Sequence, residues 1–191
     1  MKNFDIEEVN KKLQLTDEKN IFGQKFLLKN NLNCVESTSC GRLFDAVSAI
    51  LGICNVSTYE GEAAMKLQSC AENFTDEIKI FPMTTQKIFE EILIKRLEGC
   101  AVNFLAKFFH ESLAEFIADT CDQIKNRYGV KTVALSGGVF QNLLLTTLTF
   151  AKLNLRGFKV LLNKMIPPND GGICIGQAAF ATNNFIFDAK V

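Results

Sequence analysis

One segment limits the possible folds of this chain more than any other, residues 131–163, which read KTVALSGGVFQNLLLTTLTFAKLNLRGFKVLLN. Its two ends, 131–136 and 158–163, are short apolar runs typical of buried strands, and the segment between them, 141–157, has the pattern of a helix. Two strands that are joined by one helix through short connections run parallel, with a right-handed crossover. The sequence therefore predicts an α/β fold that contains a parallel strand pair.

Each of these strands leads into a loop with two adjacent glycines. Residues 136–138 (SGG) follow the first strand, and residues 170–172 (DGG) follow the second and open a final helix at 171–184. Ligands of open α/β sheets bind beyond the carboxyl ends of the strands, where helix N-termini favour anions and glycine lets a phosphate approach the backbone. A single Gly-Gly turn is more often plain backbone geometry. Two such turns on neighbouring strand ends, one with an acidic residue, favour a nucleotide or phosphate site.

The rest of the chain has helical patterns, separated by glycine and polar loops. Asp5 and Thr16 are plausible caps for one or two amphipathic helices within 5–30, and Thr84 or Thr85 caps a later helix. The stretch 76–85 has an extended pattern, which predicts a short strand or hairpin. We expect further helices at 41–52, 58–72, 86–99 and 101–128, a helical lead-in over 1–36, and one compact unit over 37–191.

Composition and charge exclude several classes of function. Lys+Arg and Asp+Glu both total 21, and no basic stripe is present, which argues against binding to nucleic acid or to anionic lipid. No apolar run reaches the ~18–20 residues that cross a bilayer. The charged start MKNFDIEEVNKKLQ is unlike a signal peptide. We therefore expect a soluble, cytoplasmic protein with no nucleic-acid or membrane partner.

The seven cysteines are scattered, with no CxxC pair, so neither a disulfide framework nor a zinc knuckle is predicted. We expect reduced cysteines that serve mostly as small core residues. A helix N-terminus can lower the pKa of a thiol, and Cys174 lies near the start of the last predicted helix. A small packing residue is nevertheless the favoured interpretation of Cys174.

Four stretches together resemble one known family. They are STSCGRLFDAVSAILG (37–52), YEGEAAMKLQ (59–68), FFHESLAEFIAD (108–119), and VALSGGVFQNLLL (133–145) followed by GFKVLLNKMIPPNDGGICIGQAAFA (157–181). In this order they look like the C-terminal part of the HypF carbamoyltransferases of [NiFe]-hydrogenase maturation. More distantly they are similar to the TsaD tRNA threonylcarbamoyl transferases and to antibiotic O-carbamoyltransferases. The resemblance implies a helix-rich α/β fold, namely a ribonuclease H-like lobe of the actin/sugar-kinase/heat-shock-chaperone-like ATPase superfamily, here incomplete.

The resemblance also implies a chemistry. In this family another domain makes carbamoyl-adenylate from carbamoyl phosphate and ATP, and the domain seen here passes the carbamoyl group to the C-terminal cysteine of HypE. The product is later dehydrated to the cyanide ligand of the hydrogenase iron. The implied partners are HypE and the other HypF domains. The implied cofactors are ATP or carbamoyl-adenylate and, in the intact protein, a divalent metal such as Fe, Zn or Mg. We expect a fragment of a longer protein that is inactive alone.

The resemblance assigns site residues to the two glycine loops. Ser136, Gly137, Gly138 and Asn142 match the motif that cradles the nucleotide, and Asp170 matches a metal-ligand aspartate. The alternative for Asp170 is a helix N-cap. The relatives complete their metal site with a histidine pair spaced HxxxH, which this chain lacks.

Other candidates come from the first half of the chain. The resemblance places Asp45 toward the sugar or adenylate, with a solvated helix position as the alternative. Gly61 and Glu62 lie near the relatives' second glycine motif, where the loop lengths differ. His110, the sole histidine, is interpreted as structural or surface, because alone it cannot supply a general base and its orienting partner. No catalytic residue is assigned.

Three alternative functions remain open. A TsaD-like tRNA-modifying subunit is disfavoured by the HypF-like forms RLFDAV and YEGEAA and by the lack of a basic run. A non-catalytic HypE-binding module would keep the core without the chemistry. A small ATPase of the same superfamily would need a glycine-rich hairpin near its N-terminus, and the first 36 residues contain none.

Overall fold

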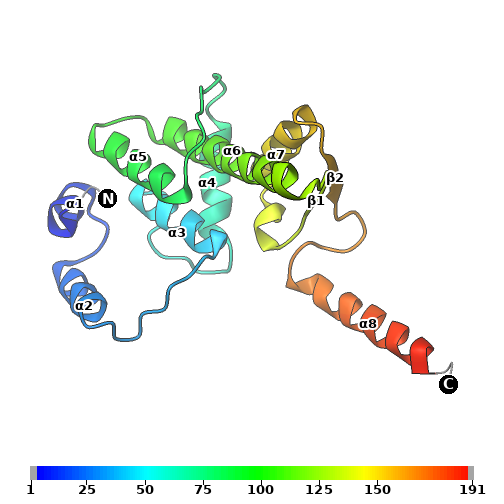
Figure 1. The fold of residues 1–191 in the computed structure, drawn as a ribbon. Helices are drawn as coiled ribbons and strands as arrows, with labels where there is room; N and C mark the ends of the chain where they lie inside the picture. The colour runs from blue at the N-terminus through cyan, green and yellow to red at the C-terminus, as the bar shows by residue number, and fades with distance from the viewer. Residues whose placement is uncertain (1–3, 189–191) are drawn as a thin grey trace. The chain divides into compact units, whose positions relative to one another are not determined.

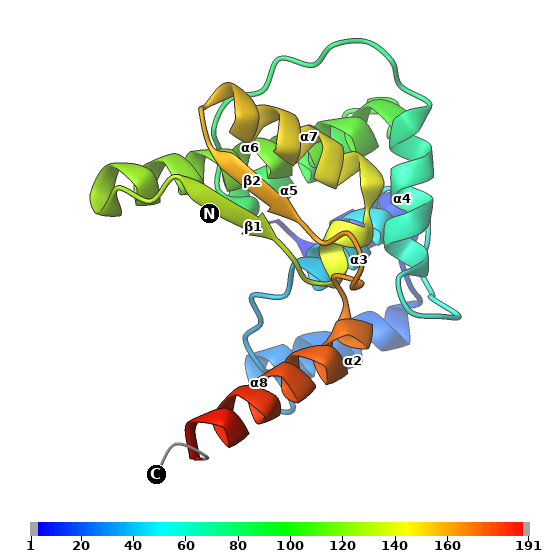
Figure 2. The same ribbon diagram turned by 90° about the vertical axis from the view of Figure 1, so that its right-hand side faces the viewer.

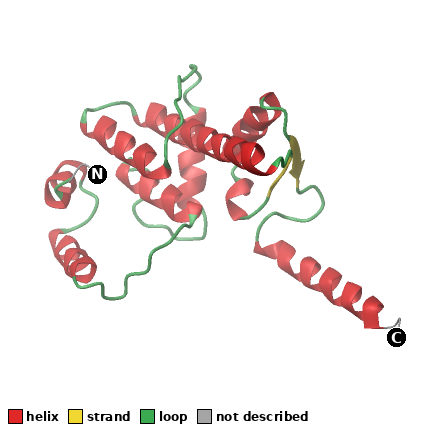
Figure 3. Ribbon diagram, viewed as in Figure 1, coloured by secondary structure: helices red, strands yellow, loops and turns green. Residues whose placement is uncertain are grey.

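The computed structural model of the protein describes residues 4–188. The chain divides into two compact units, Met1–Phe116 and Ile117–Val191. Helices make up most of the described chain, and its two strands form one small parallel pair (Figure 1 and Figure 3). This confirms the predicted helix-rich α/β class.

The first unit is entirely helical in its described part. It contains α1 (Ile6–Leu13), α2 (Glu18–Lys29), α3 (Cys40–Ile50), α4 (Glu62–Glu72), α5 (Thr85–Leu97) and the beginning of α6 (Val102–Tyr128). Helix α3 packs against α4 and α5. Buried apolar residues of α3 and its C-cap, of α4, of α5 and of the beginning of α6 recur at intervals of three or four and form the core of this unit: Phe44, Val47, Leu51, Ala63, Leu67, Ile88, Ile92, Leu105 and Phe109.

Side-chain caps decide where the first helices begin. The Asp5 carboxylate accepts a hydrogen bond from the Glu7 amide, as predicted. The prediction that Thr16 caps the next helix is wrong, because the cap is Asp17. The backbone of Thr16 instead exchanges two hydrogen bonds with the Asn10 side chain (2.9 and 3.1 Å), and these close the turn between α1 and α2.

Two further predicted boundaries differ from the structure. The helix expected over 58–72 begins only at Glu62, because Gly61 adopts a left-handed conformation with φ of 81° that an α-helix cannot contain. The stretch 76–85, expected to be a strand or hairpin, contains no strand in the described structure and leads directly into α5. Pro82 lacks an N–H for a strand ladder, which favours this outcome. Thr84 is the cap of α5, as predicted.

The second unit contains the rest of α6, followed by the predicted strand–helix–strand segment. Strands β1 (Thr132–Leu135) and β2 (Lys159–Leu162) are connected by α7 (Leu143–Leu155) and pair in parallel (Figure 2). Thr132 lies opposite Lys159 and Leu135 lies opposite Leu162. Two short 3-10 helices, η1 (Gly138–Gln141) and η2 (Asp170–Gly172), follow the strands, and α8 (Ile173–Asp188) ends the described chain. The predicted parallel pair is confirmed.

One face of this pair is covered. A cluster of Ala118, Leu135, Leu153 and Phe158 joins α6, β1, α7 and the start of β2, with Cys121, Val133, Phe140 and Val160 packed against it. The expectation that the first strand is buried holds only for Leu135. Thr132 and Ala134 are exposed, because successive strand residues point to opposite faces and only one face of the pair is packed.

Helix α8 is apolar but makes few contacts. All residues from 173 to 182 are exposed, and Phe180 keeps 71% of its surface accessible. Its contacts within the unit are mainly with η2. Among the described residues, no helix combines the length and the apolar character that crossing a bilayer requires.

Candidate functional site

The two glycine loops lie against each other at the carboxyl ends of β1 and β2. The Gly137 amide donates a hydrogen bond to the Pro168 carbonyl (2.8 Å), which joins the SGG loop to the loop before α8. Gly137 has φ of 99° and ψ of 157°, a conformation that residues with a side chain rarely adopt. A Cβ built on Gly138 would lie 3.9 Å from the Cβ of Asn169. The structure therefore brings together the two loops that the sequence singled out.

The second loop is held by Asn169, a residue that sequence reasoning missed. Its side chain accepts a hydrogen bond from the Gly171 amide (3.1 Å) and caps η2. Asp170 is therefore not the N-cap that was weighed as its alternative role; its side chain is exposed. Gly172 has no room for a Cβ, which would lie 2.7 Å from the Pro167 carbonyl oxygen. The Asn-Asp pair before Gly-Gly was the available sequence signal for a capped turn.

Asn142 has a structural role in this region. Its Oδ1 accepts a hydrogen bond from the Leu145 amide (2.9 Å) and caps α7, which begins two residues later than predicted because η1 intervenes. The Thr146 hydroxyl donates to the Phe140 carbonyl (2.8 Å) and ties η1 to α7. The side chain of Asn142 is thus engaged within the fold, whereas Ser136 and Gly137 of the preceding loop are exposed.

The described residues do not make a complete metal site. Within residues 4–188, no three His, Cys, Asp or Glu side chains lie close enough together to hold one ion. A divalent cation needs several such ligands. The residues present therefore fit at most one ligand, Asp170, and not a whole site.

The candidates of the first unit lie on α3 and at the start of α4. The Asp45 carboxylate is half-exposed and forms an ion pair with Arg42 (3.5 Å) on the same helix. Gly61 precedes α4, and Glu62 is its first residue. Helices α3 and α4 pack against each other, so these residues belong to one region of this unit.

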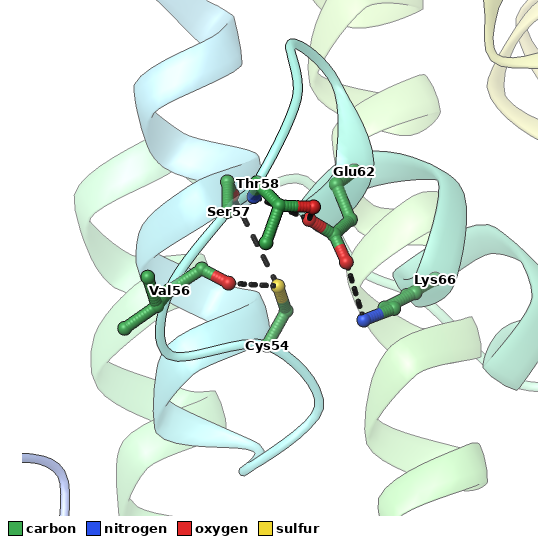
Figure 4. A network of polar contacts seen from close by, with 6 residues as sticks. All are labelled: Cys54, Val56, Ser57, Thr58, Glu62 and Lys66. Carbon is green, nitrogen blue, oxygen red and sulfur yellow. Dashed lines mark hydrogen bonds and ion pairs between the residues drawn. The ribbon is translucent and has the colours of Figure 1, made fainter.

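Glu62 is the centre of a polar network (Figure 4). Its Oε2 accepts hydrogen bonds from the amide (2.6 Å) and the hydroxyl (2.9 Å) of Thr58, and its Oε1 accepts one from Lys66 Nζ (2.6 Å). The Lys66 hydrogen bond, followed by those from Thr58, lowers the pKa of Glu62 to about 2. Neither partner was predicted. The i,i+4 spacing of Glu62 and Lys66 was the available signal.

His110 is a core residue of the first unit, which agrees with the structural interpretation. It is fully buried, and its Nδ1 lies 2.8 Å from the Ala106 carbonyl oxygen. Because a carbonyl oxygen can only accept a hydrogen bond, Nδ1 is assigned as the donor. The imidazole packs edge-on against Phe44 and Phe109, with ring centroids 5.5 Å apart in both cases. Burial lowers the pKa of His110 to about 4, so the neutral form is favoured near neutral pH.

All seven cysteines are free thiols, and the expectation that they serve mostly as core residues is wrong because Cys54 alone among them is buried. Cys54 is buried, and burial raises the pKa of the half-buried Cys40, Cys70 and Cys121 thiols. Cys174 is exposed, so its interpretation as a packing residue is wrong within the described structure. The reason is that α8 contacts little besides η2.

Comparison with known proteins gives the family. The family model described as "Carbamoyltransferase, Kae1-like Domain, second subdomain" matches residues 1–177. The probable carbamoyltransferase HypF of Methanocaldococcus jannaschii is 34% identical over 173 residues, which cover 87% of this chain and 23% of that protein. The carbamoyltransferase HypF of Rhodobacter capsulatus is 40% identical over 157 residues, which cover 81% of this chain and 21% of that protein.

Two solved structures have the same fold. A full-length HypF in the phosphate- and nucleotide-bound form superimposes with a TM-score of 0.82 at 28% identity, over 94% of this chain and 25% of that one. HypF of T. kodakarensis gives a TM-score of 0.75 at 28% identity, over 92% of this chain and 25% of that one. The chain thus spans about a quarter or less of the length of these relatives. It belongs to the family of HypF carbamoyltransferases.

Proposed function

We propose that this chain acts within a HypF-type protein in the transfer of a carbamoyl group from carbamoyl-adenylate to the C-terminal cysteine of HypE, for cyanide-ligand synthesis in [NiFe]-hydrogenase maturation. Carbamoyl-adenylate would come from carbamoyl phosphate and ATP in another part of the protein. One observation carries the proposal: the SGG and NDGG loops are joined at the strand ends by the hydrogen bond from Gly137 to Pro168, in a chain that matches this family over 1–177. The free cysteines support a reducing, cytoplasmic setting.

In this proposal the nucleotide part of the adenylate lies against the SGG loop. Ser136, Gly137 and Gly138 would offer backbone that a phosphate can approach, with Asn142 beside them. For the first unit by itself, the family resemblance proposes Asp45 as a residue toward a sugar and Gly61 as backbone that a nucleotide can approach. The similar full-length HypF structure is described as phosphate- and nucleotide-bound, which supports a nucleotide as the ligand class.

We propose that this chain supplies only part of the metal site. Asp170 would supply one carboxylate ligand, and the remaining ligands would come from outside the described residues. A bound divalent ion would polarise phosphate oxygens there. No step of the transfer is assigned to it.

A chimeric protein tests the proposal. We would replace the matching segment of Methanocaldococcus jannaschii HypF with this chain and measure carbamoylation of HypE by mass spectrometry. The chimera should carbamoylate HypE, and Gly137→Val should abolish most of this activity because valine is strained at φ of 99°. Asp170→Asn should lower the rate by at least about tenfold. Gly176→Ala is the matched control, since Gly176 has no neighbour near its Cβ position.

Two results would contradict the proposal. One is a folded chimera that makes carbamoyl-adenylate but leaves HypE unmodified. The other is a Gly137→Val chimera that transfers as fast as the Gly176→Ala control.

A second candidate is a HypE-binding module without chemistry of its own. It is favoured by the described residues 4–188, which supply at most one metal ligand, Asp170. A pull-down of HypE by the chimera, paired with the transfer assay, separates the two. A chimera that makes carbamoyl-adenylate and binds HypE but leaves it unmodified supports the module, and a chimera that carbamoylates HypE contradicts it. Robust transfer by the isolated chain, or stoichiometric metal held tightly by it, contradicts the expectation of an inactive fragment.

A further inference from the structure

The carboxylate of Glu62 has little capacity left for a ligand. A carboxylate offers about four lone-pair sites, and three of those on Glu62 receive hydrogen bonds from Thr58 and Lys66 at 2.6–2.9 Å (Figure 4). The residue is only 6% exposed. Charge-assisted bonds of this kind are stronger than neutral ones, so about one lone-pair site of the carboxylate remains for any other donor.

The same hydrogen bonds fix the loop that joins α3 to α4. Glu62 lies at the first position of α4 and reaches back four residues to Thr58, across Tyr59, Glu60 and Gly61. The Thr58, Tyr59 and Glu60 side chains are exposed, so packing does not hold this stretch. The carboxylate therefore supplies most of its anchoring.

A second anchor lies at the other end of the loop. The Cys54 thiol is buried and lies 3.4 Å from the Val56 carbonyl and 4.0 Å from the Ser57 hydroxyl (Figure 4). These sulfur contacts are weak hydrogen bonds, whereas the Glu62 bonds are short and charge-assisted. Loss of Glu62 would leave residues 55–60 held mainly by the weaker set.

The conformation of the loop decides how the Gly61 backbone is presented to a ligand. Its φ of 81° requires glycine for conformational reasons alone, because an added Cβ would meet no atom within 4 Å. Lys66 also balances the charge of Glu62, so the loop presents a neutral pair rather than a lone carboxylate to an anionic ligand. Both features suit backbone, rather than the carboxylate, as the part that meets the ligand.

We infer that Glu62 is a positioning residue, which through Thr58 holds the loop 54–61 in the one shape that presents the Gly61 backbone to the nucleotide. The inference rests on the proposed function for its ligand, but its effect on the loop does not.

Amide hydrogen exchange on the chain itself tests the effect on the loop. Glu62→Ala should speed exchange of the Thr58 amide by about 10–100-fold, the loss expected for a hydrogen bond to a charged group. Glu62→Gln keeps an acceptor oxygen for Thr58 and should speed exchange by less than about tenfold. Glu60→Ala, in the same loop and exposed, is the matched control and should leave the Thr58 amide unchanged. Unchanged exchange in Glu62→Ala overturns the inference, whatever the chimera does.

Kinetics of the chimera test the link to the ligand. If Glu62 acts through Thr58, Glu62→Ala lowers the rate of HypE carbamoylation without lowering the rate at which the chimera makes carbamoyl-adenylate. Thr58→Val, which removes the hydroxyl bond but keeps the amide bond, has a smaller effect in the same direction, the double variant is no worse than Glu62→Ala, and Glu62→Gln restores most of the loss. If Glu62 touches the nucleotide itself, Thr58→Val leaves the transfer rate unchanged and the inference is overturned. An inactive chimera would count against the proposed function, while the exchange measurement would still decide the role of Glu62.

Discussion

Replacing His110 by leucine should remove the pH dependence of stability near neutral pH. His110 is the sole histidine of the chain, so it is the one side chain whose ordinary pKa lies in this range. Burial, the largest influence, lowers its pKa in the folded state to about 4 from an ordinary value of 6.5, and the nearby Lys107 charge acts in the same direction.

The sign and size follow from proton uptake. Between the two pKa values the unfolded chain binds a proton that the folded chain does not, so stability is full above the unfolded pKa and falls as the pH decreases. A folded pKa near 4 implies a loss of about 2 kcal/mol between about pH 7.5 and pH 5, and about 3 kcal/mol below the folded pKa. Such a loss is a large share of the ~5–15 kcal/mol that stabilises a domain.

Urea unfolding followed by far-UV circular dichroism measures this slope, since the chain contains no tryptophan. His110→Leu should flatten the curve in this pH range, whatever its effect on absolute stability. Phe22→Leu, at a position 76% exposed, is the matched control and should keep the slope of the unchanged chain. A flat curve for the unchanged chain, or an unaltered slope in His110→Leu, would refute the reasoning.

Three further outcomes are expected. Gly172→Ala should lower the free energy of unfolding by about 1–3 kcal/mol, because the added Cβ overlaps the Pro167 carbonyl oxygen. Gly176→Ala, in open space on a helix, should stabilise by about 0.5–1 kcal/mol, and equal effects in urea unfolding would contradict the packing argument. Phe44→Ala should lower the free energy of unfolding by about 3–5 kcal/mol, against about 0.5 kcal/mol or less for the exposed Phe22→Ala; similar losses would argue against the described core. Glu62 has a pKa of about 2 in the folded state, so its contribution to the stability of the fold is present above pH 4.5 and is lost as the pH falls toward 2. Glu62→Gln should therefore lose less helix signal in circular dichroism on acidification than the unchanged chain. A greater loss would be inconsistent with the network.

The parts of the fold that follow from local periodicity could be predicted from the sequence. The apolar spacing on α3 and α6 and the strand–helix–strand pattern each depend on residues close in the chain, and their positions agree with the structure. The meeting of the SGG and NDGG loops followed from the rule that parallel strands end on the same side. These inferences needed no knowledge of side-chain contacts.

Competition between neighbouring residues could not be resolved in this way. Thr16 and Asp17 are both good caps, and the choice was made by Asn10, whose side chain already binds the Thr16 backbone. Asp170 and Asn169 present the same problem at η2. Capping depends on which side chain reaches the free amide, and sequence alone does not state that distance.

The role of Glu62 is a different kind of difficulty. A carboxylate beside a glycine motif suggests a ligand contact, yet three hydrogen bonds within the chain engage it. The helix was expected to begin at Thr58, so Glu62 was placed one turn inside it rather than at its first position, where its carboxylate reaches back to the Thr58 amide. An error in one helix boundary thus concealed the partner of a site residue.

The exposure of Cys174 makes it suitable for labelling once the half-buried Cys34 and Cys100 are replaced by serine. Its thiol is the exposed one of the seven and lies beside the NDGG loop, where it donates to the Gly171 carbonyl at 3.6 Å. The thiolate is the form that reacts with maleimides, so thiols that are buried, or whose pKa burial raises, should react more slowly. An environment-sensitive fluorophore attached at this position would report on the proposed nucleotide loop.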